Sequence, residues 1–113
     1  MAIKNEDLKS YPFLADMYSD DYFPDHLVDK GRNILITLCE TIEAENPESL
    51  DDLYALTHAA TEEFNDLAGE FEEEESEIET AARDCIGNDF AAIAEAYGFD
   101  DADIEELIAP RDW

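Results

Sequence analysis

Apolar residues recur at spacings of three and four along three long stretches of this chain, and this pattern constrains its fold more than any other feature. The stretches run from Leu27 to Ile42, from Leu50 to Phe71 and from Ile78 to Tyr97. Such spacing places the apolar side chains on one face of an α-helix. Only four Gly and four Pro interrupt a chain rich in strong helix formers. The sequence therefore predicts an all-α fold.

Local signals predict where these helices begin and end. Pro47 disfavours helix at the residue before it, and Ser49 follows as an N-cap, with Asp52 three residues later as a variant of the reciprocal cap. Gly98 ends the third helix, and Pro110 stops a short helix near the C-terminus. The predicted architecture is a small bundle of three main helices, at about 24–46, 49–73 and 76–97, with a short C-terminal helix at about 101–109.

The stretch "EFEEEESEIET" holds the densest run of acids. Ser76 and Glu79 match the S-x-x-E capping box, which predicts that the third helix begins at about Ser76 and that Glu77 and Glu79 lie in its first turn. The four glutamates at 72–75 fall at the C-terminus of the preceding helix, where the helix dipole disfavours negative charge. If the second and third helices fold back antiparallel here, Phe71 lies opposite Ile78.

The segment "YPFLADMYSDDYFPDHL" is rich in aromatic residues and is interrupted by Pro12 and Pro24. It predicts a short helix or turn followed by an irregular stretch, with its aromatic side chains covering part of the bundle. The whole chain, 1–113, fits one helical domain with one modest core.

The charge of the chain is extreme, with 32 Asp and Glu against six Lys and Arg, for a formal net charge of −26. Such a field opposes direct binding of nucleic acid or an anionic membrane and favours a basic protein partner. The acids are spread along the chain, which is typical of a surface adapted to high salt, where screening shortens the range of repulsion to about 3 Å at 1 M. The sequence leaves a saline habitat and a binding surface open as explanations.

Cysteine use and the N-terminus bear on the compartment. Cys39 and Cys85 lie in apolar helical stripes without a CxxC motif, which predicts two buried reduced thiols. The start "MAIKNEDLKS" lacks the apolar core of a secretory signal, and no stretch approaches the length of a membrane span. We expect a cytoplasmic protein; the sequence leaves its oligomeric state open.

A polar cluster in "THAATEEFN" is the best candidate for chemistry. His58 and Glu62 are four residues apart on one helical face, with Asn65 near the next turn, and antiparallel pairing would bring Asp89 close. A histidine beside a carboxylate can ligate a metal or act as a general base, but a metal site normally needs three or four ligands. The alternative is a partly buried histidine hydrogen-bonded to a neighbour.

Other candidate features carry less chemical information. The acid run lacks the central glycine of an EF-hand, so only weak cation binding is expected there. Closely spaced carboxylates can also mimic the phosphates of DNA. In "APRDW", Arg111 and Trp113 are residue types favoured at interfaces, although a tryptophan that closes the core is the alternative. No nucleophile elbow, phosphate loop or H-E-x-x-H motif occurs, so we expect no cofactor.

Four segments carry a resemblance to a known family: "HLVDKGRNILITLCETIE", "LYALTHAATEEFNDL", "SEIETAARDCI" and "IAEAYGFDDADIEELIAPRDW". They resemble a family of small acidic bacterial proteins known only as a domain of unknown function. The resemblance covers nearly the whole chain from Tyr11 onward. It implies one domain and a bacterial origin, and it implies no activity, cofactor or catalytic residue.

These observations lead to one main functional hypothesis and two alternatives. The main hypothesis is a non-enzymatic protein-interaction module, in its concrete form an immunity-like or antitoxin-like inhibitor of a basic partner, with a surface acidified for high salt. The first alternative is a small metal- or ligand-binding protein, or an enzyme, that uses His58, Glu62, Asn65 and Asp89. The second alternative is a DNA mimic.

Overall fold

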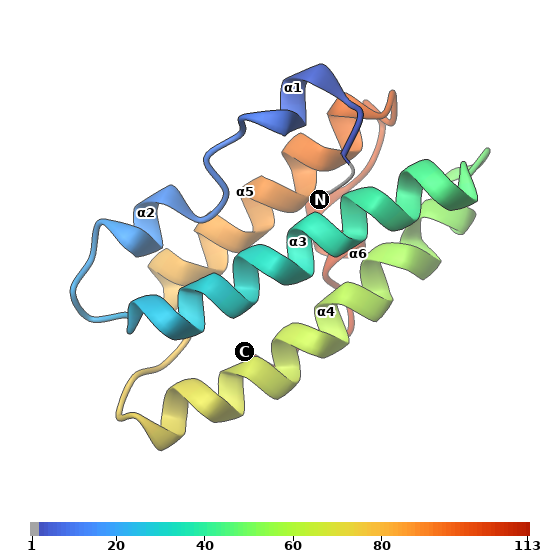
Figure 1. Ribbon diagram of the computed structural model, residues 1–113. Helices are drawn as coiled ribbons and strands as arrows, with labels where there is room; N and C mark the ends of the chain where they lie inside the picture. Colours follow the sequence, from blue (N-terminus) through green and yellow to red (C-terminus); the bar gives the residue numbers. More distant parts are fainter. Residues whose placement is uncertain (1–2) are drawn as a thin grey trace.

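The computed structural model describes residues 3–113 and shows three long helices with three short ones (Figure 1). The described residues contain no strand, which confirms the predicted all-α class. In chain order the helices are α1 (Glu6–Lys9), α2 (Ala15–Tyr18), α3 (Asp25–Glu45), α4 (Leu50–Glu73), α5 (Thr80–Ala96) and α6 (Ile104–Leu107).

The antiparallel pair α3 and α4 forms one side of the molecule, and α5 runs alongside α3 with α1 and α2 packed against it (Figure 1). Gly31 allows the close approach of this pair. A Cβ atom at Gly31 would lie 2.9 Å from Leu14 Cδ1 and 3.1 Å from Phe64 Cε1. The glycine therefore leaves room for one side chain from α4 and one from residues 3–24, which we name the N-terminal segment.

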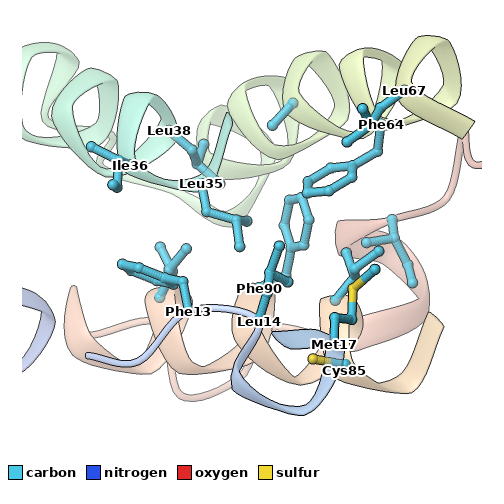
Figure 2. Close-up of a cluster of buried hydrophobic side chains, with 14 of the residues drawn as sticks. Phe13, Leu14, Met17, Leu35, Ile36, Leu38, Phe64, Leu67, Cys85 and Phe90 are labelled. Atoms are coloured by element: carbon cyan, nitrogen blue, oxygen red, sulfur yellow. The ribbon is translucent and has the colours of Figure 1, made fainter. Parts of the chain in front are cut away.

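The core lies between these layers, and aromatic residues bridge it. Figure 2 shows Phe64 of α4 and Phe90 of α5 pointing toward one another, with ring centroids 6.0 Å apart. Leu14 and Met17 enter the same core from the N-terminal segment. The backbone of α4 lies nearest to α3 and α6, so the predicted pairing of α4 with α5 is made through side chains and is looser than expected.

The beginning of α5 corrects the prediction of a capping box at Ser76. The helix starts at Thr80, and Glu77 and Glu79 precede its first turn, with no side-chain cap from Glu79. Ser76 is buried and faces a different neighbour, because its hydroxyl donates to the carbonyl oxygen of Tyr22 at 3.0 Å. The Ser76 hydroxyl thus bonds to the N-terminal segment and does not cap α5 in the way that the motif predicted.

The backbone at the end of α4 explains the same correction. The Ser76 N–H donates to the Phe71 carbonyl at 2.9 Å and the Glu75 N–H to the Glu72 carbonyl at 3.1 Å, the two bonds of a Schellman motif. Glu75 adopts a left-handed conformation, with φ of 63°. This closed helix end directs the chain away from α4 before α5 can begin.

The short elements differ in part from the prediction. The C-terminal helix α6 is shorter than the predicted 101–109 and begins after Asp103, whose side chain caps the N–H of Glu105. The expected short helix in the aromatic segment is α2, while α1 was not predicted. Asn5 caps α1 by accepting from the N–H groups of Asp7 and Leu8.

Candidate functional site

Three side chains of α4 at helical spacing face the C-terminal segment, residues 103–113. They are His58, Thr61 and Asn65, and we name them the α4 polar stripe. His58 Nε2 lies 2.6 Å from the carbonyl oxygen of Glu106. Because a carbonyl can only accept, Nε2 carries the proton. Thr61 is fully buried, and its hydroxyl lies 3.3 Å from the carbonyl oxygen of Leu107 and 2.8 Å from that of Thr57.

Asn65 extends the stripe by binding the chain after α6 at two points. Its amide nitrogen donates to the Pro110 carbonyl at 3.1 Å, and its amide oxygen accepts the Asp112 N–H at 3.0 Å. One turn before the stripe, the ring of Tyr54 stacks on His58 with an interplanar angle of 9°. The stripe therefore holds the C-terminal segment by its backbone groups.

Asp89 lies with the N-terminal segment and not with the stripe. Its carboxylate accepts from the backbone N–H of Leu14 at 2.7 Å and from the hydroxyl of Tyr11 at 3.1 Å, and only 6% of the residue is exposed. Desolvation by burial raises the pKa of Asp89 above its usual value, although both hydrogen bonds act in the opposite direction. Leu14 has a left-handed backbone, with φ of 58°.

The four-residue cluster expected from the sequence is thus divided. His58 and Asn65 both contact the C-terminal segment, Glu62 is exposed, and Asp89 contacts the N-terminal segment. The expected approach of Asp89 to His58 depended on a close pairing of α4 with α5. The chain instead places α6 between these helices, and α6 takes the hydrogen bond of His58.

Glu43 is a second carboxylate that binds the N-terminal segment; it is half-buried and is not among the site residues predicted from the sequence. It accepts from the N–H groups of Lys4 at 2.8 Å and Asn5 at 3.0 Å, and from the hydroxyl of Tyr97 at 2.5 Å. Desolvation raises the pKa of Glu43, but these donors outweigh it and leave the pKa below its usual value. No local sequence signal distinguishes it among 32 acids.

Arg111 and Trp113, the proposed interface anchors, contact their own chain. Arg111 pairs with Glu105 at 3.1 Å. The Trp113 ring lies 6.1 Å from the ring of Phe64 in an edge-on arrangement, and its carbonyl accepts from Arg83 Nε at 3.2 Å. Trp113 is half-buried, and its indole nitrogen is buried without a hydrogen-bond partner in the described chain. Trp113 thus covers one edge of the core.

The two thiols are confirmed as buried and free. Burial raises the pKa of Cys39 to about 12 and that of Cys85 to about 11. Since the thiolate is the reactive form, neither side chain is a nucleophile near neutral pH. Within residues 3–113, no group of three or more His, Cys, Asp or Glu side chains is placed to hold a metal ion.

A concave surface lies at the corner where α3 meets α4, and we name it the corner hollow. It has a volume of about 550 Å³ and is lined by Glu45, Asn46, Pro47, Glu48, Asp52, Ala55 and Leu56. Its three carboxylates are exposed, whereas Pro47 and Leu56 are half-buried. The hollow thus combines a negative rim with apolar walls.

These features define a small all-α bundle in which the long helices bind both ends of the described chain by side-chain hydrogen bonds. The chain belongs to the Family of unknown function (DUF5713), whose model matches residues 7–113. No curated protein and no solved structure matches the chain. Among the described residues, no helix has the length and apolar character to cross a membrane.

Proposed function

We propose that this protein is a non-enzymatic interaction module that binds a basic protein partner at the corner hollow. Its concrete form is an immunity-like or antitoxin-like inhibitor of a basic toxin or nuclease. The observation that carries the proposal is the union of three exposed carboxylates with apolar walls in one 550 Å³ hollow.

The chemistry of the hollow matches a lysine or arginine side chain. Such side chains place an aliphatic stem along apolar surface and keep the charged head among polar groups. Leu56 and Pro47 offer the apolar surface, and Glu45, Glu48 and Asp52 offer the counter-charges. A field of net charge −26 would also accelerate encounter with a basic partner.

The engagement of the reactive side chains favours a module over an enzyme or a metal protein. His58 is hydrogen-bonded to a backbone carbonyl, and both thiols are buried with raised pKa values. Asp89 is bound by two donors from the N-terminal segment. Three of the four residues that the alternative used, His58, Asn65 and Asp89, therefore hold the fold, while Glu62 is exposed.

The distribution of the other acids favours a surface adapted to high salt over a DNA mimic. Exposed carboxylates occur on each long helix, for example Asp29 on α3, Glu63 on α4 and Glu95 on α5. A DNA mimic needs carboxylates in two rows on one face. If the surface is adapted to salt, the melting temperature should rise steeply between 0.1 and 1 M NaCl, and an unchanged value would contradict this part of the proposal.

The partner hypothesis is tested by pull-down from lysate with two matched variants. The first neutralises the corner hollow with Glu45→Gln, Glu48→Gln and Asp52→Asn. The control neutralises Glu62, Glu63 and Asp66, exposed residues of the middle of α4, and changes the net charge equally. We expect a basic protein to be retained by the wild type and the control and lost by the first variant. Equal loss in both variants would show that only overall charge acts.

A further inference from the structure

Three of the four glycines have a structural role, and Gly69 does not. Cβ atoms at Gly31 and Gly87 would lie 2.9 Å from Leu14 and 3.2 Å from Ile104, and Gly98 has a positive φ of 89°. Gly69 lies near the end of α4, and a Cβ atom there would meet nothing within 4 Å. Glycine is the least favourable residue after proline inside a helix, so the fold itself gives no reason for it.

Gly69 lies in a hollow of about 480 Å³ between α4, the connection to α5 and the C-terminal segment. We name this the Gly69 hollow; it is lined by Asn65, Ala68, Gly69, Glu72, Glu77, Ile78, Asp112 and Trp113. The missing side chain at Gly69 leaves the α4 backbone open to a ligand. A volume of this size is within the range of small-molecule sites.

The walls of the Gly69 hollow are partly apolar and partly acidic. Trp113 and Ile78 offer an aromatic and an aliphatic surface, while the exposed carboxylates of Glu72, Glu77 and Asp112 come from three different segments of the chain. An aromatic face next to carboxylates suits an organic cation, through cation–π attraction and ion pairing.

The arrangement of the three carboxylates indicates the number of charges on the ligand. They line one hollow, yet in the described chain they do not form a group that could hold a metal ion. The hollow, at about 480 Å³, is also much larger than one compact cation. A ligand with several cationic groups joined by apolar spacers would match both the charges and the walls.

We infer that the Gly69 hollow binds a linear aliphatic polyamine. Its ammonium groups pair with Glu72, Glu77 and Asp112, and its methylene spacers lie against Trp113 and the α4 backbone at Gly69. This inference is independent of the partner proposed for the corner hollow, because residues 52–56 near the start of α4 line the corner hollow, whereas residues 65–72 near its end line the Gly69 hollow.

Trp113 is the only tryptophan of the chain, so its fluorescence reports on this hollow. The test is a titration with the triamine spermidine at fixed ionic strength, with isothermal calorimetry as a second readout. We expect a saturable change in wild-type emission and at least tenfold weaker binding in Gly69→Leu, which fills the hollow. Ala59→Leu, at an exposed site on α4, should bind like the wild type.

Further arms make the inference falsifiable even if Gly69→Leu fails to fold. The double variant Glu72→Gln with Glu77→Gln should weaken binding, while Glu62→Gln with Glu63→Gln should not. Magnesium chloride and n-butylammonium should give no saturable signal. Equal binding of either ion, retention of affinity in Gly69→Leu, or tight binding only of an arginine-containing peptide would overturn the inference.

Discussion

The two ends of the described chain are held to the bundle by hydrogen bonds of mostly opposite polarity, although the N–H of Asp112 donates to Asn65. The N-terminal segment offers backbone N–H groups, and the carboxylates of Glu43 and Asp89 accept them from Lys4, Asn5 and Leu14. The C-terminal segment offers backbone carbonyls to donor side chains, which are His58, Thr61, Asn65 and Arg83.

An acidic chain can use carboxylates within its fold where backbone and hydroxyl donors meet them. A carboxylate loses solvation on burial and is tolerated only where donors replace the water. The N-terminal segment supplies such donors at both Glu43 and Asp89, and in each case a tyrosine hydroxyl adds another. None of the four side chains that bind the C-terminal segment is a carboxylate, so we expect pH changes in the range where carboxylates titrate to affect the attachment of the N-terminal segment more strongly.

The largest effect is expected for Asp89→Ala, which leaves the buried N–H of Leu14 without its acceptor. An unsatisfied buried donor costs about 1–3 kcal/mol of unfolding free energy. Urea denaturation measures this loss. Asp84→Ala, at an exposed position on the same helix, is the control and should change the stability by less than about 0.5 kcal/mol. Equal effects of the two variants would show that Asp89 does not anchor the N-terminal segment.

Asn65→Ala should have the next largest effect, because it removes both of the hydrogen bonds that Asn65 makes to the C-terminal segment. At about 1 kcal/mol for each neutral bond, we expect a loss of about 2 kcal/mol. The emission of Trp113 should shift to the red as the segment gains exposure to water. Asp66→Ala, at the exposed neighbouring position, should leave the emission unchanged. An unshifted spectrum in Asn65→Ala would mean that packing alone holds the C-terminal segment.

Tyr11→Phe should cost less, about 1 kcal/mol, because Asp89 keeps the shorter hydrogen bond from Leu14. Thermal melting of Tyr11→Phe, of Asp89→Ala and of the double variant forms a cycle that separates the two contacts of Asp89. If Tyr11→Phe costs as much as Asp89→Ala, the hydroxyl rather than the backbone bond carries the attachment.

The smallest effect, and the one most specific to the N-terminal segment, is the dependence of stability on pH. The pKa of Asp89 is raised on folding, so its ionisation lowers stability as pH rises from about 3.9 through the folded pKa. The pKa of Glu43 is lowered, so its contribution is present above about 4.3 and is lost as pH falls through the folded pKa.

Comparison with neutral variants isolates these two contributions from those of the other acids. The stability of the wild type relative to Asp89→Asn should fall as pH rises, while that relative to Glu43→Gln should fall as pH drops. Urea denaturation between pH 3 and 7 measures both differences. Slopes of the same sign would contradict the opposite pKa shifts.

Much of the fold could be predicted from the sequence, because the helical stripes and their breakers are local. The ends of α3 and α4 lie within one residue of the predicted positions. The start of α5 could not be predicted, because Ser76 satisfies a capping motif locally and yet binds the carbonyl of Tyr22, 54 residues away in sequence. A contact between distant segments overrode the local preference.

The candidate site was predictable only in part. The helical spacing of His58 and Asn65 indicated one polar face on α4, and in the structure both side chains contact the C-terminal segment, which was not predicted. Thr61 gave no separate signal, because a threonine within the stretch from Leu50 to Phe71 suits a core by its methyl group, yet its buried hydroxyl lies 3.3 Å from the carbonyl oxygen of Leu107. Glu43 was not separable from the other acids by composition.

The helical class, the length of the long helices and the acidic surface follow from residue type and local spacing, so they can be read from the sequence alone. Tertiary packing selects the few carboxylates and the other polar residues that bind the chain ends. These choices depend on backbone groups that are far apart in sequence and meet only when the layers pack. The hollow over Gly69 was decided in the same way, since a glycine without a neighbour is recognisable only once its surroundings are known.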